Sequence, residues 1–164
     1  MIIRKETLED ISAITYVIDI AFKNHPHRTN NESYIVNKLR DKQKLILSLV
    51  ATEKNKVIGH VCFSPVYINS CDYGWCGLAP LSVLPDHQGN GVGENLVSKG
   101  LEELEAIGIK GCVLLGDPGY YSRFGFKHDD ELILPGVPQS YFLVLPFHHY
   151  TPHGSASFDK EFDC

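Results

Sequence analysis

Residues 81–101 read LSVLPDHQGNGVGENLVSKGL, and this stretch decides the fold. An apolar run typical of a buried strand leads through a glycine-rich turn, GNGVG at residues 89–93, into apolar side chains at helical spacing. The first N–H groups of a helix have no partner within it, and with the positive end of the helix dipole they form an anion site. Glycines let the backbone approach that anion closely. The stretch therefore predicts a site for a phosphate or diphosphate.

Other phosphate loops fit this turn less well. The P-loop of nucleotide hydrolases needs Lys followed by Ser or Thr after its glycines, and the chain has Glu94-Asn95 there. A Rossmann dinucleotide turn needs its third glycine at the position of Glu94, and its glycines normally follow the strand directly, whereas residues 85–88 intervene here. The Rossmann reading, and a tight turn that binds nothing, stay open as alternatives at this point.

The segments on either side predict a mixed α/β sheet with helices on both faces. Pro80 cannot donate a ladder hydrogen bond, so the long strand that contains it should be interrupted or bulged there. Strands are expected at 2–5, 45–52, 57–68, 73–84, 112–115 and 141–145, helices from Thr7 to Phe22, at 32–40 and at 92–107, and a helical turn at 120–124.

Length and composition bound the function. The 164 residues suit a single domain, 1–164, with a core at about 1–146 and an irregular C-terminal tail at 147–164. A formal charge of -5 argues against nucleic acid as a partner, and neither a signal peptide nor a membrane span is predicted. Five cysteines without CxxC spacing fit a reducing cytoplasm and suggest neither a disulfide framework nor a metal site. The histidines of the tail (His148, His149 and His153) are best explained as a solvated loop.

The turn also matches the Gln/Arg-x-x-Gly-x-Gly/Ala signature of GNAT acetyltransferases at every specified position. The sequence resembles the GNAT superfamily over nearly its whole length, and YhbS-like predicted bacterial acetyltransferases most of all. That second likeness rests on Ala79-Pro80-Leu81 and on Leu115-Gly116-Asp117-Pro118 before Tyr-x-x-x-Gly-Phe. The resemblance implies the GNAT acyl-CoA N-acyltransferase fold, with a central, mostly antiparallel sheet splayed at a bulged strand. It also implies acetyl-CoA as co-substrate, no metal, and dimers in many relatives, so a homodimer is an open expectation.

The resemblance assigns roles to residues of this chain. It places the pantetheine arm against the strand and the diphosphate against the turn, and it makes Tyr121 the general acid toward the departing thiolate. Tyr120 beside it is more simply an amphipathic core side chain. The Val83 N–H would face the developing oxyanion. The implied coenzyme-binding residues are Leu81, Ser82, Val83, Gln88, Gly89, Asn90, Gly91, Val92 and Gly93.

The base that deprotonates the acceptor is not specified, because residues 74–84 contain no carboxylate where many relatives have one. Water could carry the proton away, or Asp117, Glu32, His25 or His27 could accept it, although each of the four is more simply a solvated side chain. The resemblance therefore implies an N-acetyltransferase that acts by direct attack on a primary amine of a small molecule or protein. The alternative is a non-catalytic acyl-CoA-binding sensor.

Overall fold

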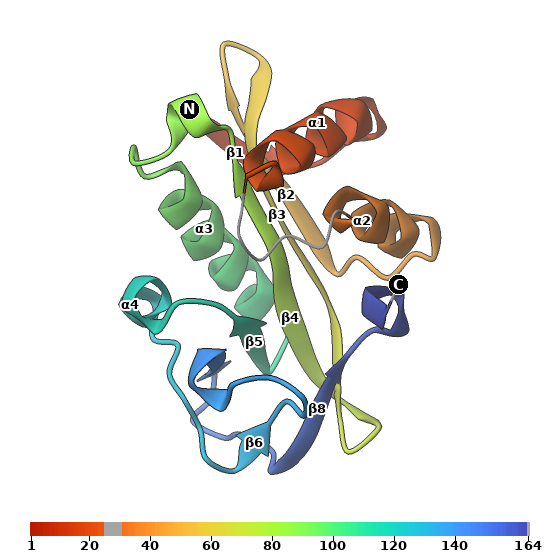
Figure 1. Ribbon diagram of the computed structural model, residues 1–164, viewed down its shortest axis with the longest axis vertical. Helices are drawn as coiled ribbons and strands as arrows, with labels where there is room; N and C mark the ends of the chain where they lie inside the picture. The colour runs from red at the N-terminus through yellow and green to blue at the C-terminus, as the bar shows by residue number, and fades with distance from the viewer. Residues whose placement is uncertain (25–30, 164) are drawn as a thin grey trace.

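In the computed structural model the described residues form an eight-stranded sheet, in which six strands follow one another in the order β1-β2-β3-β4-β5-β7 (Figure 1). Every neighbouring pair in this order is antiparallel except β4 and β5, which confirms the predicted mixed, mostly antiparallel sheet. These six strands are β1 (Ile2–Lys5), β2 (Leu47–Glu53), β3 (Lys56–Ile68), β4 (Cys71–Val83), β5 (Gly111–Leu115) and β7 (Phe142–Pro146). The structure describes residues 1–24 and 31–163.

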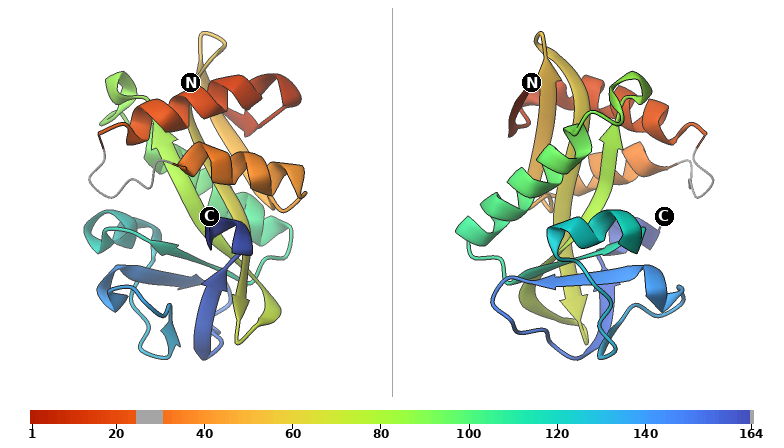
Figure 2. Two further views of the ribbon diagram at one scale, coloured as in Figure 1. Left: turned by 45° about the vertical axis from the view of Figure 1, so that its right-hand side comes forward. Right: turned by 90° about the vertical axis from the view of Figure 1, so that its left-hand side faces the viewer.

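Helices cover both faces of this sheet, as predicted (Figure 2). On one face lie α1 (Ile11–Phe22) and α2 (Glu32–Asp41), and on the other lies α3 (Val92–Ala106). Each buries one apolar stripe and leaves its polar side to solvent, as amphipathic spacing dictates. Short helical segments follow at α4 (Pro118–Tyr121) and at η1 (Leu8–Asp10), η2 (Pro85–His87), η3 (Ser122–Phe124), η4 (Gln139–Tyr141) and η5 (Lys160–Asp163). None of the described helices is long and apolar enough to cross a membrane.

The central strand β4 is bulged and then separates from β5. Its register with β3 jumps from Val61 opposite Leu81 to Phe63 opposite Leu78, so two residues, Ala79 and Pro80, are accommodated at one position of the partner. Pairing with β5 covers only the three residues Trp75, Cys76 and Gly77. The interruption predicted from Pro80 is confirmed, and the two strands splay apart beyond it.

The C-terminal segment is regular in part, which corrects the prediction of an irregular tail at residues 147–164. It contains β8 (Gly154–Phe158), which pairs antiparallel with the end of β3 and parallel with the short β6 (Leu132–Ile133). The side chain of Asp159 is buried and pairs with Lys44 at 3.0 Å. A buried charge is costly unless it is paired, so this contact helps to fix the tail against the connection between α2 and β2.

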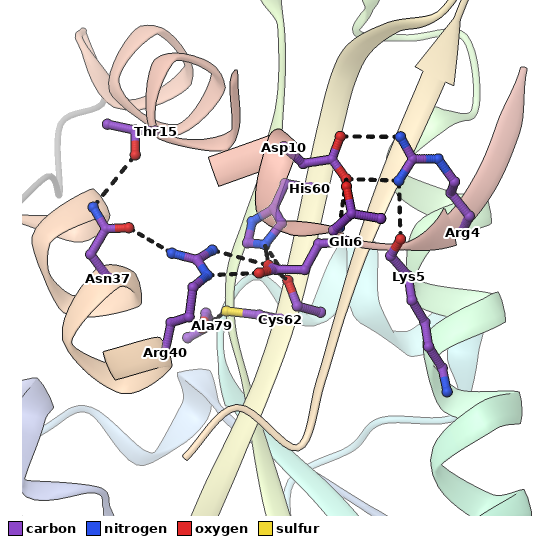
Figure 3. A network of polar contacts seen from close by, with 12 residues as sticks. Arg4, Lys5, Glu6, Asp10, Thr15, Asn37, Arg40, His60, Cys62 and Ala79 are labelled. Carbon is purple, nitrogen blue, oxygen red and sulfur yellow. Dashed lines mark hydrogen bonds and ion pairs between the residues drawn. The ribbon is translucent and has the colours of Figure 1, made fainter. Parts of the chain in front are cut away.

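A polar cluster lies between α2 and the sheet, formed by Glu6, Arg40, Ser48 and His60 (Figure 3). The Arg40 guanidinium donates two hydrogen bonds to the Glu6 carboxylate, at 2.6 and 3.0 Å. The Ser48 hydroxyl hydrogen-bonds Glu6 and lies 2.9 Å from His60 Nε2. Burial alone would raise the pKa of Glu6, but the bonds from Arg40 and Ser48 outweigh it and lower that pKa. The cluster thus joins β2, β3, α2 and the residue that follows β1 through paired polar groups.

Candidate functional site

The glycine turn presents unpaired main-chain donors. Gly89 and Gly91 adopt left-handed conformations, with φ of 79° and 83°, which glycine reaches without strain. Gly91 is the N-cap of α3, and its carbonyl accepts the Asn95 N–H at 3.0 Å. The N–H groups of residues 92–94 therefore have no partner within the helix. These are the main-chain donors on which the predicted anion site depends.

A cavity of about 380 Å³ opens beside this turn. It is lined from one side by the turn and the end of β4, and from the other by α4 and η3. The lining residues are Leu81, Val83, His87, Gln88, Gly89, Gly91, Val92, Gly93, Glu94, Tyr120 and Arg123. A second cavity of the same volume lies beside the Glu6 and Arg40 pair, far from the turn, and its principal charged groups already bind each other.

Two of the predicted coenzyme-binding residues do not line the cavity. Ser82 is 1% exposed and is paired with His60 across the sheet, so its side chain lies on the face opposite to those of its neighbours in β4. Asn90 belongs to the turn but is absent from the lining. The other seven predicted residues come together around one space.

The end of β4 offers main-chain groups to this space. The Leu84 N–H donates to the Ile58 carbonyl at 2.9 Å, which makes these two residues a hydrogen-bonded pair of the β3–β4 ladder. Hydrogen-bonded and non-bonded pairs alternate in an antiparallel ladder, so Ser82 is also bonded to β3, whereas Leu81 and Val83 are not. The N–H and C=O groups of Leu81 and Val83 therefore point away from β3, toward the gap beside β5.

The Gln88 side chain is used within the fold. Its Nε2 donates to the Val83 carbonyl at 3.0 Å, which ties the glycine turn to the end of β4. The bond leaves the Val83 N–H uncommitted. Gln88 thus shapes the site, in addition to any contact that it makes with a ligand.

Tyr121 is mostly buried at the edge of the core. Its ring packs edge-on against Tyr120 and Phe126, with centroid separations of 4.9 and 6.0 Å. Burial raises the pKa of Tyr121 well above its usual range, so the phenol stays protonated. No hydrogen bond to its hydroxyl is found among the described residues, so the O–H is uncommitted. Tyr121 itself is not one of the residues that line the cavity, although its neighbour Tyr120 is.

Tyr120 lines the cavity, which corrects the expectation that it is only a core residue. Its hydroxyl lies 3.1 Å from the point where a β-carbon on Gly93 would be, so the glycine at this position permits a close approach. Sequence reasoning also missed His87 and Arg123. Arg123 follows Tyr120 by three residues, a spacing that places two side chains together on one helical turn, and this is the signal that could have identified it.

Comparison with known proteins agrees with this geometry. The model of the Acetyltransferase (GNAT) family matches residues 9–126. The chain belongs to this family. It is 38% identical over 146 residues to the uncharacterised N-acetyltransferase YhbS of Escherichia coli (strain K12), covering 86% of this chain and 84% of that protein. The predicted likeness to YhbS is confirmed.

Two crystal structures of GNAT proteins superpose on nearly the whole chain. A GNAT family acetyltransferase from Brucella melitensis in complex with acetyl-CoA matches with a TM-score of 0.89 and 43% identity, covering 99% of this chain and 97% of that one. YhbS from Escherichia coli in complex with CoA matches with a TM-score of 0.89 and 34% identity, covering 99% and 92%. The predicted GNAT fold is confirmed by both.

Of the four side chains considered as the base for the GNAT reaction, the structure describes Asp117 and Glu32. Asp117 caps α4 by accepting the Gly119 N–H at 2.9 Å, a structural role. Glu32 lies in the first turn of α2 and accepts the Asn31 N–H at 2.9 Å. His25 and His27 lie outside the described residues. Within the described part of the chain no group of side chains suits a metal ion, and His153 instead pairs with Glu131 at 2.6 Å.

Proposed function

We propose that this GNAT protein transfers the acetyl group of acetyl-CoA to a primary amine of a small molecule or protein, by direct attack within a ternary complex. The observation that carries the proposal is the set of unpaired N–H groups of residues 92–94 beside the cavity, next to the outward-facing main chain of Leu81 and Val83. Relatives that match nearly the whole chain bind acetyl-CoA or CoA.

The residues of the site fit this co-substrate. The donors of the turn from Gly89 to Gly93 suit the diphosphate, since positive φ and missing β-carbons keep the approach open. The outward N–H and C=O groups of Leu81 suit the amide groups of the pantetheine arm, which would pair with β4 as an added strand. Ser82 has its main chain committed to β3 and the Val83 carbonyl accepts from Gln88, so we assign the pairing to Leu81 and leave the Val83 N–H for the thioester.

The chemistry requires no protein nucleophile. Acetyl-CoA supplies a thioester whose carbonyl carbon the amine attacks, so that a C–N bond forms and the C–S bond breaks. The Val83 N–H donates to the carbonyl oxygen as negative charge develops there, a contribution of about 3 kcal/mol for one such donor. The Tyr121 hydroxyl gives a proton to the sulfur, and water takes the proton lost by the amine and restores that of Tyr121.

The experiment that tests this function measures release of free thiol from acetyl-CoA over a panel of amines and peptides, beside calorimetry with CoA. Thiol release with one class of amine supports the enzyme. If CoA binds but no thiol is released with any acceptor or acyl-CoA, the non-catalytic sensor is favoured. The lack of a carboxylate in residues 74–84 is the observation that supports this alternative. Absence of any heat of binding from the folded protein would overturn both.

Replacing Tyr121 by Phe tests the proposed acid. We expect kcat to fall about 100-fold, within the range for general acid catalysis, while the Kd of CoA stays unchanged because the ring and its packing remain. Tyr73→Phe is the control, since Tyr73 is an exposed tyrosine of β4 that does not line the cavity, and we expect it to retain kcat. Unchanged turnover of Tyr121→Phe at saturating acetyl-CoA would contradict the assignment.

A further inference from the structure

Arg123 is held in place at the edge of the coenzyme cavity. Its guanidinium carbon lies 4.4 Å from the centroid of the Tyr120 ring, and its Nε donates to the Tyr120 carbonyl at 2.9 Å. Tyr120 in turn lies against Gly93 of the glycine turn. Stacking and hydrogen bonding together orient a guanidinium before any ligand arrives, so little side-chain freedom is lost on binding.

Most of the donors of this guanidinium are unused. Its Nη1 lies 3.4 Å from Glu94 Oε2, longer than the roughly 2.7–2.9 Å typical of a charge-assisted bond. For Nη2, no acceptor is found in residues 1–24 and 31–163. An oriented planar fork with free N–H groups is the arrangement that binds a phosphate through two bonds.

Glu94 creates a need for such a cation. It stands in the first turn of α3 and lines the same cavity, so its carboxylate lies where a negatively charged ligand is expected. Two like charges in one site repel each other, and the side chain of Glu94 is 53% exposed, so water screens part of this effect. Arg123, whose guanidinium lies beside Glu94, is placed to offset the repulsion that water does not screen.

We propose that Arg123 is a phosphate-binding residue of the coenzyme site, which exchanges its loose contact with Glu94 for a phosphate of CoA. This inference rests on the proposed function, because it presupposes that CoA occupies the cavity. The phosphate belongs either to the diphosphate or to the ribose 3′-phosphate, and the two sources can be separated experimentally. The same guanidinium also shields the ligand from the Glu94 carboxylate.

Calorimetry with CoA and with 3′-dephospho-CoA tests the proposal. We expect Arg123→Gln to weaken CoA binding about tenfold or more, as expected for loss of a hydrogen bond to a charged group. A weakening seen only with CoA assigns the ribose phosphate, and one seen with both ligands assigns the diphosphate. Lys99→Gln is the matched control, since Lys99 is 43% exposed against 46% for Arg123 but lies outside the cavity. We expect no change in that variant.

Two further measurements separate recognition from packing. Glu94→Gln should tighten CoA binding about twofold, because repulsion is removed while the fold is left intact. The affinity of Arg123→Gln should depend less steeply on salt than that of the wild type, as loss of one phosphate contact requires. Equal affinities of wild type and Arg123→Gln for both ligands, or a loss of affinity independent of salt, would overturn the role. Failure of the wild type to bind CoA would instead show that the proposed function is wrong, and the role of Arg123 would fall with it.

Discussion

His60 is uncharged in the folded protein at neutral pH. Its side chain is 0% exposed, and burial lowers its pKa to about 4 even though Glu6 nearby favours the charged form. In the unfolded chain the pKa returns to about 6.5. Below pH 6.5 the unfolded state therefore binds a proton that the folded state does not, so stability falls as pH falls toward 4.

The resulting prediction concerns urea unfolding at two pH values. Between pH 7.5 and pH 5 we expect the free energy of unfolding to drop by about 2 kcal/mol through His60. Glu6 and Asp10 also have lowered pKa values, but the stability that they contribute is lost almost entirely at pH values below this window. His60→Gln should abolish most of the drop, whereas His128→Gln, at a side chain 43% exposed, should leave it. An equal drop in all three proteins would contradict the prediction.

At the scale of elements, the Phe158 ring of β8 packs closely against Gly77 of β4. A β-carbon on Gly77 would overlap the Phe158 ring and would lie 3.0 Å from Val66 Cγ2. We expect Gly77→Ala to cost about 1–3 kcal/mol of stability, as overpacking does. In a double-mutant cycle measured by urea unfolding, Phe158→Ala should relieve part of this cost. If the two substitutions change the free energy of unfolding in a strictly additive way, the added methyl group at residue 77 is accommodated by movements other than that of the Phe158 ring.

The elements differ in how far the sequence alone predicts them. α3 and the interrupted strand β4 are predictable because apolar spacing and Pro80 act locally. β8 is not, since Ala156 is its one fully buried residue and its partners lie far away in β3 and β6. The glycine turn of the candidate site is predictable as well, because its donors are main-chain N–H groups. Tyr120 and Arg123 could not be predicted, since they line the cavity only because α4 and η3 lie opposite the turn.

At the scale of the whole molecule, the cavity lies between the part of the sheet up to β4 and the part that begins with β5, and few strand pairs connect the two. β4 and β5 share only three residue pairs, and the lining comes from the glycine turn on one side and from α4 and η3 on the other. A ligand that contacts both sides should reduce local opening, because binding to the folded state alone stabilises it.

Hydrogen exchange with and without acetyl-CoA tests this coupling. We expect slower exchange of the amides of residues 118–124 and 89–93, with little change in the fast-exchanging amides of α2, which does not line the cavity. At a ligand concentration about 100 times Kd the gain is about 2.7 kcal/mol, so Tm should rise by about 5–10 °C. NAD should give neither effect, because the turn departs from the dinucleotide pattern at Glu94. A rise in Tm that protects the turn but not α4 would show that the coenzyme is held by the α3 side alone.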